Sequence, residues 1–343
     1  MKAVVFSKHG GPEVLRVAEV SDPRPRADEV LVRVRACSIN HLDLWVRRGL
    51  PGVEILMPHI PGSDVSGEIA AVGELVNDVH VGEKVILAPG VSCGHCHACL
   101  AGDDNLCRKY TLLGYLIDGG CAELVKAPAR NVFPLPDSLS FEEAAAVPLV
   151  FLTAWHMLVT RAKLQPGEEV LILGGGSGVG SAGIQIAKML GGRVIATVGS
   201  DDKVEKTKAL GADHVVLHSQ TGWQSDVKRL THKHRGVDVV FEHVGTATWD
   251  HSLAALATGG RLVTCGATTG YDAKLDLRFL FSRHLSVLGS YMGSKAELFP
   301  VLDLVARKIL HPVIDSVLPL DHCAEAHARL ERRHAFGKIV LRV

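Results

Sequence analysis

The fold is decided by the stretch Val170-Leu-Ile-Leu-Gly-Gly-Gly-Ser-Gly-Val-Gly180, in which a short apolar run leads into a cluster of glycines. Apolar residues follow at Ile184, Ile186, Ala187 and Leu190, a spacing that is typical of an amphipathic helix. A glycine turn between a strand and a helix lets the backbone approach a pyrophosphate, and the helix N-terminus supplies N–H donors and a positive dipole. This stretch therefore predicts a nucleotide-binding unit.

The glycines allow two registers for the turn. A literal G-x-G-x-x-G begins only at Gly178, four residues after the expected start of the turn. A turn that begins at Gly174 or Gly175 fits the end of the strand better, with Ser177 in place of the middle glycine. The residues of the turn that we expect to bind the cofactor are Gly174, Gly175, Ser177, Gly178, Val179 and Gly180.

The next predicted strand, Arg193–Val198, ends without the acidic residue that commonly selects NAD(H) at this place. The first acids, Asp201 and Asp202, come slightly late and also suit the first turn of a helix, where negative charge is favourable. Ser200 and Lys203 are suited to bind a 2′-phosphate, although the two carboxylates would repel it. We expect NADP(H) or NAD(H), with NADP(H) slightly favoured.

Strands and helices alternate beyond this point, which is typical of a parallel, doubly wound sheet. The further strands are expected at His214–Leu217, Val237–Phe241, Arg261–Cys265 and Leu285–Leu288. The first 130 or so residues are instead β-rich, because stretches such as Glu29–Ala36 alternate polar and apolar residues as half-buried strands do. After about Ser294 we expect a helix at Lys295–Ile309, an extended run, a helix at Asp321–His334 and a last strand at Lys338–Val343.

Composition excludes several classes of protein. The chain has 343 residues, with 37 Lys and Arg against 37 Asp and Glu, and this length predicts two domains. Zero net charge argues against a nucleic-acid binder and a polybasic membrane anchor, and 47% hydrophobic content argues against disorder. No secretory signal or membrane-spanning stretch is visible, so we expect a cytoplasmic protein whose eight cysteines do not form disulfides.

The cysteines Cys93, Cys96, Cys99 and Cys107 lie within fifteen residues of one another. Thiolates in a short loop suit a tetrahedral zinc ion, which stabilises loops that have no core of their own. An iron–sulfur cluster is one alternative. In the ferredoxin pattern, however, three residues separate the third cysteine from a Cys-Pro pair, whereas here seven residues separate Cys99 from Cys107. A loop without metal is the other alternative. We expect a closed, structural zinc site.

The cysteine cluster followed by the glycine turn resembles the medium-chain dehydrogenase/reductase family, which contains zinc-type alcohol dehydrogenases and quinone oxidoreductases. Supporting stretches are Pro61-Gly-Ser-Asp-Val-Ser-Gly67, Val81-Gly-Glu-Lys-Val85, Gly236-Val-Asp-Val-Val240, Gly259-Gly-Arg-Leu-Val263 and Gly337-Lys-Ile-Val-Leu341. The resemblance covers essentially the whole chain and implies an α/β fold, with a doubly wound Rossmann domain and a GroES-like, β-rich catalytic domain. The implied catalytic domain comprises residues 1–149 and 295–343, with the zinc lobe at about 91–109, and the Rossmann domain comprises residues 150–294.

The resemblance also implies that the usual catalytic zinc has lost its ligands. Zinc-dependent members have a Cys, a His and a second Cys where this chain has Asn40, Ser63 and Leu149. Cys37 lies three residues too early to replace the first ligand. These positions retain no thiolate or imidazole for tetrahedral zinc, and they resemble those of the zinc-free quinone and enoyl reductases.

Hydride transfer belongs to the nicotinamide, so the protein has to hold the substrate and stabilise developing charge. We expect Asn40, His41 and Ser63 to donate hydrogen bonds to a carbonyl or enolate oxygen. The residues expected to orient these donors or relay protons are Asp43, His59 and Asp64. Structural roles are the alternative, such as a helix cap at Asn40 or an ion pair at Asp64. An unusual metal site made from His41, His59 and Asp64 is another.

These residues predict an NAD(P)(H)-dependent oxidoreductase that transfers hydride to or from a quinone, an enone or another carbonyl or alcohol substrate, with one structural zinc. One alternative is a zinc-dependent alcohol dehydrogenase with an atypical catalytic metal site. Another is a nucleotide-binding protein without turnover, similar to zeta-crystallin. Leu285–Gly289 is expected to be an edge strand that invites pairing with a second copy, and the resemblance likewise implies a homodimer or homotetramer.

Overall fold

The computed structural model describes residues 1–343 and divides the chain into two compact units. Unit 1 consists of residues 1–149, 294–308 and 312–343, and unit 2 consists of residues 150–293 and 309–311. The chain passes from unit 1 to unit 2 within helix α4 (Pro148–Trp155). No helix combines the length and the apolar character that a membrane span requires.

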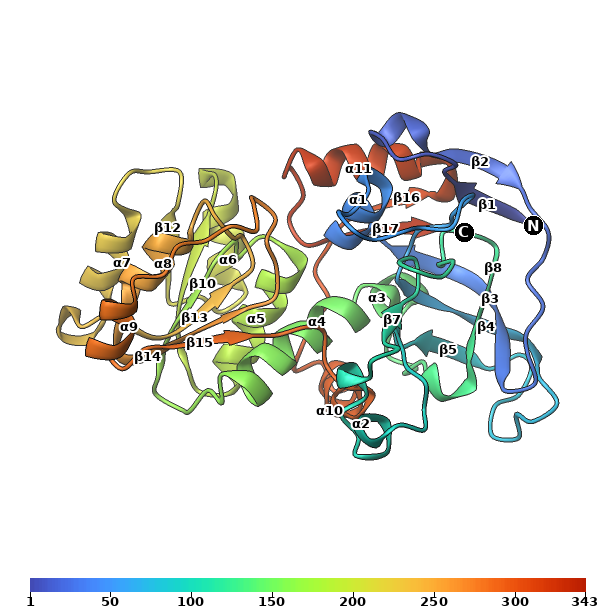
Figure 1. The fold of residues 1–343 in the computed structure, drawn as a ribbon, viewed down its shortest axis with the longest axis horizontal. Helices are drawn as coiled ribbons and strands as arrows, with labels where there is room; N and C mark the ends of the chain where they lie inside the picture. Colours follow the sequence, from blue (N-terminus) through green and yellow to red (C-terminus); the bar gives the residue numbers. More distant parts are fainter. The chain divides into compact units, whose positions relative to one another are not determined.

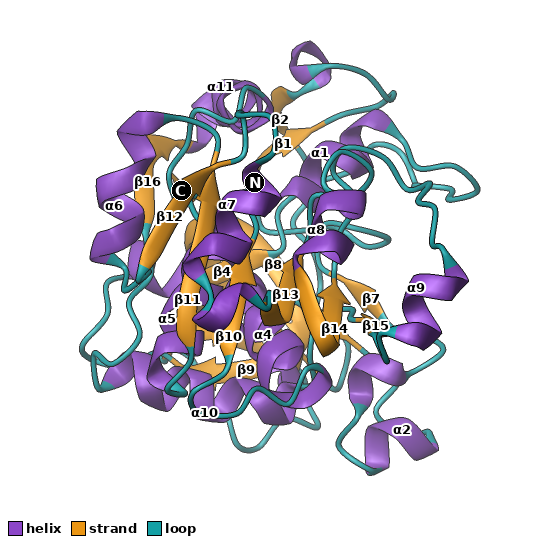
Figure 2. Cartoon of the chain, turned by 90° about the vertical axis from the view of Figure 1, so that its left-hand side faces the viewer, coloured by secondary structure: helices purple, strands orange, loops and turns teal.

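Unit 2 alternates strands with helices. Its strands are β10 (Glu169–Ile172), β11 (Arg193–Val198), β12 (His214–Leu217), β13 (Val237–Glu242), β14 (Leu256–Thr264) and β15 (Ser286–Gly289). Its helices after α4 are α5 (Gly178–Met189), α6 (Val204–Ala209), α7 (Trp223–Leu230), α8 (Trp249–Ala255) and α9 (Leu277–Ser282). The strands form one parallel sheet in the order β12-β11-β10-β13-β14-β15, which confirms the doubly wound arrangement (Figure 2).

This sheet is covered on both faces, with α5 and α6 on one side and α7 and α8 on the other (Figure 1). Its apolar strands pack against Trp223 and Val227 of α7, and both side chains are buried. The strand order reverses between β10 and β13, because the chain builds outward first through β11 and then through β13. In such sheets ligands bind outside the carboxyl ends of the strands at the point of reversal.

Unit 1 is β-rich, as the sequence predicts. Its strands are β1 (Lys2–Val5), β2 (Arg16–Glu19), β3 (Glu29–Ser38), β4 (Asp64–Val72), β5 (Lys84–Leu87), β6 (Gly90–Val91), β7 (Thr111–Leu112), β8 (Leu124–Pro128), β9 (Val132–Pro134), β16 (Ile314–Pro319) and β17 (Lys338–Arg342). Its helices are α1 (His41–Arg48), α2 (His97–Leu100), α3 (Phe141–Ala145), α10 (Lys295–Ala306) and α11 (Cys323–Glu331). Seven strands form one sheet in the order β16-β17-β3-β4-β5-β9, with β8 also paired to β3.

The long strand β3 organises this sheet. It pairs antiparallel with β4, β8 and β17, so N-terminal and C-terminal parts of the chain lie side by side. Its alternate residues Val30, Val32 and Val34 are buried in the core of unit 1. This is the alternation from which the sequence predicts a half-buried strand.

The differences from the sequence predictions lie mainly at the ends of elements. The strand predicted at Arg261–Cys265 begins at Leu256, because a bulge that includes Gly259 keeps the earlier residues paired with β13. The helix predicted at Lys295–Ile309 ends at Ala306. The helix predicted at Asp321–His334 starts as a single 3-10 turn and ends at Glu331 as α11.

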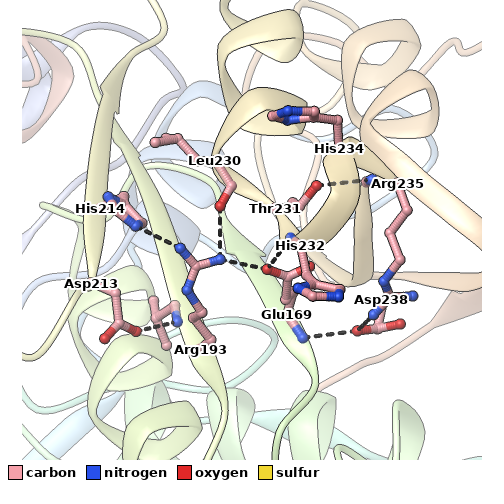
Figure 3. A network of polar contacts seen from close by, with 12 residues as sticks. Glu169, Arg193, Asp213, His214, Leu230, Thr231, His232, His234, Arg235 and Asp238 are labelled. Carbon is pink, nitrogen blue, oxygen red and sulfur yellow. Dashed lines mark hydrogen bonds and ion pairs between the residues drawn. The ribbon is translucent and has the colours of Figure 1, made fainter.

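A polar network fastens the starts of the unit 2 strands, at the edge opposite the carboxyl ends (Figure 3). Arg193 opens β11, and its guanidinium donates to the Glu169 carboxylate, to Leu230 O (2.7 Å) and to His214 Nε2 (2.7 Å). Glu169 is buried and also accepts a hydrogen bond from His232 N (3.0 Å). A guanidinium can only donate, so His214 has to accept through Nε2. This network therefore supports the sheet and is not arranged to bind a ligand.

We expect Glu169→Gln to destabilise unit 2 by about 1–3 kcal/mol, because Arg193 and the amide of His232 lose a buried acceptor charge. Chemical denaturation measures this change. The matched control is Asp303→Asn, which removes the exposed ion pair with Arg307 and should cost less than about 0.5 kcal/mol. Equal stability of the two variants would contradict the structural role of the network.

Candidate active site and metal centre

Several candidate catalytic residues meet in a buried cluster of unit 1. Asn40 precedes α1, and its backbone N–H donates to Asp43 Oδ2 (2.7 Å). The Asn and the acid three residues later form a capping box, which explains why the helix begins here. The side chain of Asn40 donates from Nδ2 to Oδ2 of Asp64, the first residue of β4 (2.9 Å).

Lys338 completes this cluster from β17, on the other side of β3. Its ammonium donates to Asp64 Oδ2 (3.0 Å), to Ile39 O (3.0 Å) and to Asn40 Oδ1. The side chains of Lys338 and Asp64 are 4% and 0% exposed. Such a buried pair is stable only when each charge has partners, because an uncompensated buried charge costs several kcal/mol.

The polar groups of this cluster are occupied within unit 1. The ammonium of Lys338 has three acceptors, and Asp64 also accepts hydrogen bonds from Ser38 Oγ (3.2 Å) and Leu149 N (2.8 Å). The amide of Asn40 directs its oxygen to Lys338 and its nitrogen to Asp64. Asn40 thus caps α1 and Asp64 forms an ion pair, and these are the structural roles that the sequence allowed as alternatives to catalysis.

Asp43 ties α1 to the loop before β4. Its Oδ1 accepts from Gly62 N (2.8 Å), and its Oδ2 accepts from Asn40 N (2.7 Å). Burial raises the pKa of Asp43, while His327, these amides and the charge of Lys338 act in the opposite direction. A Cβ on Gly62 would lie 2.6 Å from Cys37 Sγ, and Gly62 has φ +103°, so only glycine fits here.

Ser63 differs from its neighbours because its hydroxyl is buried and has no hydrogen-bond partner within the chain. Buried hydroxyls are ordinarily paired, since leaving one unpaired costs about 1–3 kcal/mol. The contacts of Gly62 and Asp64 fix the backbone on both sides of Ser63. Ser63 therefore has a buried hydroxyl whose hydrogen-bonding capacity no group of the chain uses.

The two candidate histidines lie in different environments. His59 is buried and donates from Nε2 to Gly114 O (3.1 Å), and burial lowers its pKa. His41 opens α1, is partly exposed, and places its ring 6.4 Å from that of Trp45. His41, His59 and Asp64 do not form a group of converging metal ligands, so the structure does not assemble the alternative metal site.

The residues at the positions where the resemblance places the catalytic zinc ligands do not fit a tetrahedral zinc ion. Asn40 is engaged by Lys338 and Asp64, Leu149 has no side-chain donor atom, and Ser63 offers only a hydroxyl. Zinc in proteins is bound by Cys, His and carboxylate ligands. No step through a zinc ion can be derived at this position.

The four cysteines of the lobe do fit zinc. Their sulfur atoms all lie within 4.8 Å of one another, with 3.5 Å between Cys96 and Cys99 and 3.8 Å between Cys93 and Cys99. Four sulfurs around a zinc ion at ~2.3 Å are about 3.8 Å apart in a tetrahedron. The amides of His95 and Cys96 face the Cys93 thiol, so the backbone of the loop offers hydrogen-bond donors to this sulfur. The sulfur of Cys107 completes this group of four.

A second support fastens the lobe to α10. Asp104 accepts a hydrogen bond from Lys295 N (2.8 Å) and forms an ion pair with the Lys295 ammonium. The same ammonium donates to Ser92 Oγ (3.3 Å). Both members of the ion pair have largely buried side chains, 16% exposed for Lys295 and 8% for Asp104.

The glycine turn of unit 2 follows the carboxyl end of β10. Its middle residue Ser177 caps α5, and the Ser177 hydroxyl accepts from Gly180 N (2.9 Å). Gly174 has φ +57°, and a Cβ on Gly180 would lie only 2.3 Å from Gly174 O. The turn thus has the register that starts at Gly174. The first amides of a helix lack intrahelical acceptors, so this tight turn offers the donors that a pyrophosphate needs.

The predicted 2′-phosphate residues lie beyond the end of β11. Ser200 precedes a single 3-10 turn, Asp201–Lys203. A hydrogen bond with Ser200 lowers the pKa of Asp202, so the hydroxyl is engaged with a neighbouring acid. Gly199 follows the last residue of β11, and a Cβ built on it would lie 3.3 Å from His218 Nε2.

Lys338 belongs to this cluster, although no sequence motif predicts it as a site residue. It lies 274 residues after Asp64 in the chain, so no local spacing connects the two. The available signal is a lysine directly before the apolar run Ile339–Leu341, because a lysine in a buried strand requires a partner.

Two family models match the chain. Residues 26–137 match the alcohol dehydrogenase GroES-like domain, and residues 178–307 match the zinc-binding dehydrogenase model. An alcohol dehydrogenase of Geobacillus stearothermophilus is 34% identical over 100% of both chains. A quinone oxidoreductase of Sus scrofa is 30% identical over 99% of this chain and 97% of its own. A crystal structure described as NAD-dependent alcohol dehydrogenase superposes with a TM-score of 0.96 at 48% identity, over 100% of both chains.

The lobe geometry predicts about one zinc per chain. We expect Cys96→Ser to reduce the zinc content to near zero and to lower the unfolding temperature, because a structural zinc ion contributes directly to folding. Elemental analysis and thermal unfolding measure the two effects. Cys265→Ser is the matched control, since Cys265 lies outside the cluster and should leave the zinc content unchanged. Equal zinc loss in both variants would argue against the lobe as the site.

Proposed function

Because this chain belongs to the medium-chain dehydrogenase/reductase family of zinc-type alcohol dehydrogenases and quinone oxidoreductases, we propose that it reduces quinones and conjugated carbonyl compounds with NAD(P)H. The observation that carries this proposal is the buried, unpaired hydroxyl of Ser63. It stands beside a closed network in which Asn40, Asp64 and Lys338 satisfy one another. We further propose that the four lobe cysteines hold one structural zinc ion.

The proposed chemistry divides between the cofactor and the chain. A bound nicotinamide supplies the hydride. Ser63 donates a hydrogen bond to the carbonyl oxygen of the substrate, where negative charge develops, and its buried position makes this bond stronger than it would be in water. Asn40, Asp43 and Asp64 keep the Ser63 loop in place through contacts with α1 and β17. After hydride transfer the reduced substrate takes up one proton, which the partly exposed His41 supplies and then regains from solvent.

Quinones and enones suit this site better than alcohols. Alcohol oxidation develops an alkoxide, which zinc-dependent enzymes stabilise with a Lewis acid. The donor set at Asn40, Ser63 and Leu149 does not suit zinc, but a hydroxyl donor is sufficient to stabilise an enolate oxygen.

An atypical alcohol dehydrogenase is the second candidate. The 48% identical structure described as an alcohol dehydrogenase favours it. It requires a second metal ion, so about two zinc ions per chain would support it. Binding of NAD(P)H without turnover of any substrate would instead support a nucleotide-binding protein that is not an enzyme.

One observation favours NADP(H) as the cofactor, and another favours NAD(H). Strand β11 ends at Val198 without an acid, and Ser200 and Lys203 follow, which favours NADP(H). The description of the 48% identical structure names NAD, which favours NAD(H). The ratio of kcat/KM for NADPH and NADH decides between them.

We also propose that unit 2 pairs with a second copy of the chain. Strand β15 lies at the edge of the sheet, as the sequence predicts, and its backbone is available for pairing. The exposed apolar side chains of the neighbouring α9 are Leu277, Phe279 and Phe281. Light scattering on the purified chain tests this assembly, and a monomeric mass would contradict it.

The decisive experiment compares Ser63→Ala with the wild-type chain on a quinone, an unsaturated aldehyde and a primary alcohol, each with NADH and NADPH. We expect kcat/KM for the quinone or aldehyde to fall about 10²–10³-fold, the usual effect of removing one oxyanion donor. The unfolding temperature should not fall, because an unpaired buried hydroxyl does not stabilise the fold.

The matched control for this experiment is Ser38→Ala. The Ser38 hydroxyl donates to Ala145 O (2.7 Å) and Asp64 Oδ2 (3.2 Å), so its loss should lower stability by about 1 kcal/mol. Full activity of Ser63→Ala would refute the role of Ser63. A large loss of stability in Ser63→Ala would show that its hydroxyl is structural.

A further inference from the structure

His243 follows β13 directly, so it lies at the carboxyl edge of the sheet, across the point of strand reversal from the glycine turn. Its side chain is largely buried, and its Nε2 lies 2.7 Å from Leu173 O. A carbonyl oxygen only accepts hydrogen bonds, so Nε2 carries the proton and donates. The ring therefore joins the two central strands at the place where a nucleotide would bind.

This contact replaces a backbone bond of the sheet. The last backbone hydrogen bond between the two strands runs from Leu173 N to Phe241 O (3.1 Å). The carbonyl of Leu173 would next need a backbone donor from β13, but the chain turns away, and the imidazole N–H takes that place. A buried carbonyl without this donor would remain unsatisfied at the first step of the turn.

The ring also contacts the turn itself. A Cβ built on Gly174 would lie 3.1 Å from His243 Cε1, so the ring closes the space beside this left-handed residue. The Ser177 hydroxyl lies 3.5 Å from His243 Nε2 and accepts from Gly180 N (2.9 Å). His243 thus touches the beginning of the turn and borders the cap of α5.

The opposite side of the turn is held from β11. Gly175 N donates to Thr197 O (2.7 Å), and Gly174 N donates to Thr197 Oγ1 (3.2 Å). The turn is therefore fastened by Thr197 from one neighbouring strand and by His243 from the other. The contact from β11 uses backbone and hydroxyl groups, whereas the contact from β13 depends on one side chain.

We propose that His243 is a positioning residue for the dinucleotide, which holds the glycine turn in the conformation that binds the pyrophosphate through its hydrogen bond to Leu173 O. Burial lowers the pKa of His243, which keeps the ring neutral. This inference uses the nucleotide binding of the family and does not depend on the identity of the substrate or on Ser63.

The test compares two amide variants. Their side-chain nitrogens lie as many bonds from Cβ as one or the other nitrogen of the histidine ring. In His243→Gln the amide nitrogen is as many bonds from Cβ as Nε2 is, so it can reach Leu173 O, whereas in His243→Asn it is one bond shorter. Titration of NADH and NADPH fluorescence measures the dissociation constants without any substrate. We expect about a tenfold weaker affinity for His243→Asn, near wild-type affinity for His243→Gln, and little change of kcat at saturating cofactor in either.

Two further variants separate positioning from general stability. His243→Met fills similar space without a donor, and it should weaken binding as His243→Asn does. His214→Leu removes the acceptor of Arg193 at the opposite edge of the same sheet, so it should lower the unfolding temperature and leave cofactor affinity unchanged (Figure 3).

Two outcomes would overturn the proposal. Wild-type affinity in both His243→Asn and His243→Met would show that the hydrogen bond to Leu173 O does not matter for binding. Equal weakening in His243→Gln and His243→Met would assign the effect to ring packing against Phe241, whose ring centroid lies 6.1 Å away. Failure of the proposed reductase activity would leave these binding measurements intact, so the two proposals fail separately.

Discussion

The buried ion pair of Lys338 with Asp64 is the interaction on which the candidate site depends. It fixes β17, β4 and the start of α1 relative to one another, because Asn40 hydrogen-bonds to both charges. A buried pair contributes little net stability compared with apolar residues, but it tolerates very few geometries. The pair therefore serves mainly to hold these three elements in one arrangement. The charges satisfy one another completely, and the neighbouring Ser63 hydroxyl is left as the unpaired group.

Local patterns were sufficient to predict most of the fold. The glycine stretch after Val170 predicts the turn between β10 and α5, and the spacing of Cys93 to Cys107 predicts a cluster whose sulfurs do converge. The predicted start of a strand is wrong where a backbone irregularity decides it, as in β14 with the bulge that includes Gly259. The roles of Lys338 and His243 could not be predicted, because each acts on a residue brought close only by strand pairing.

The two functional regions are stabilised in different ways. In unit 1, the candidate residues depend on charges that are removed from water, and each charge is matched by several donors or acceptors. In unit 2, the glycine turn depends on close backbone approach, and few polar side chains hold it. The cysteine lobe combines both, since its four sulfur atoms converge as metal ligands would, while Asp104 and Lys295 fasten it to α10 by an ion pair. Substitutions should therefore impair these regions through different physical causes.

The position of β17 has a consequence for biosynthesis. The strands of unit 2 all lie between residues 169 and 289, so its sheet can form as soon as that part of the chain has left the ribosome. The sheet of unit 1 cannot, because β16 and β17 follow the strands of unit 2 in the chain and β17 pairs with β3. Until β17 emerges, Asp64 lacks its counter-charge and the edge of β3 is open at Ala36–Ser38. In a nascent chain, unit 2 can thus be folded before β17 is available to complete the sheet of unit 1.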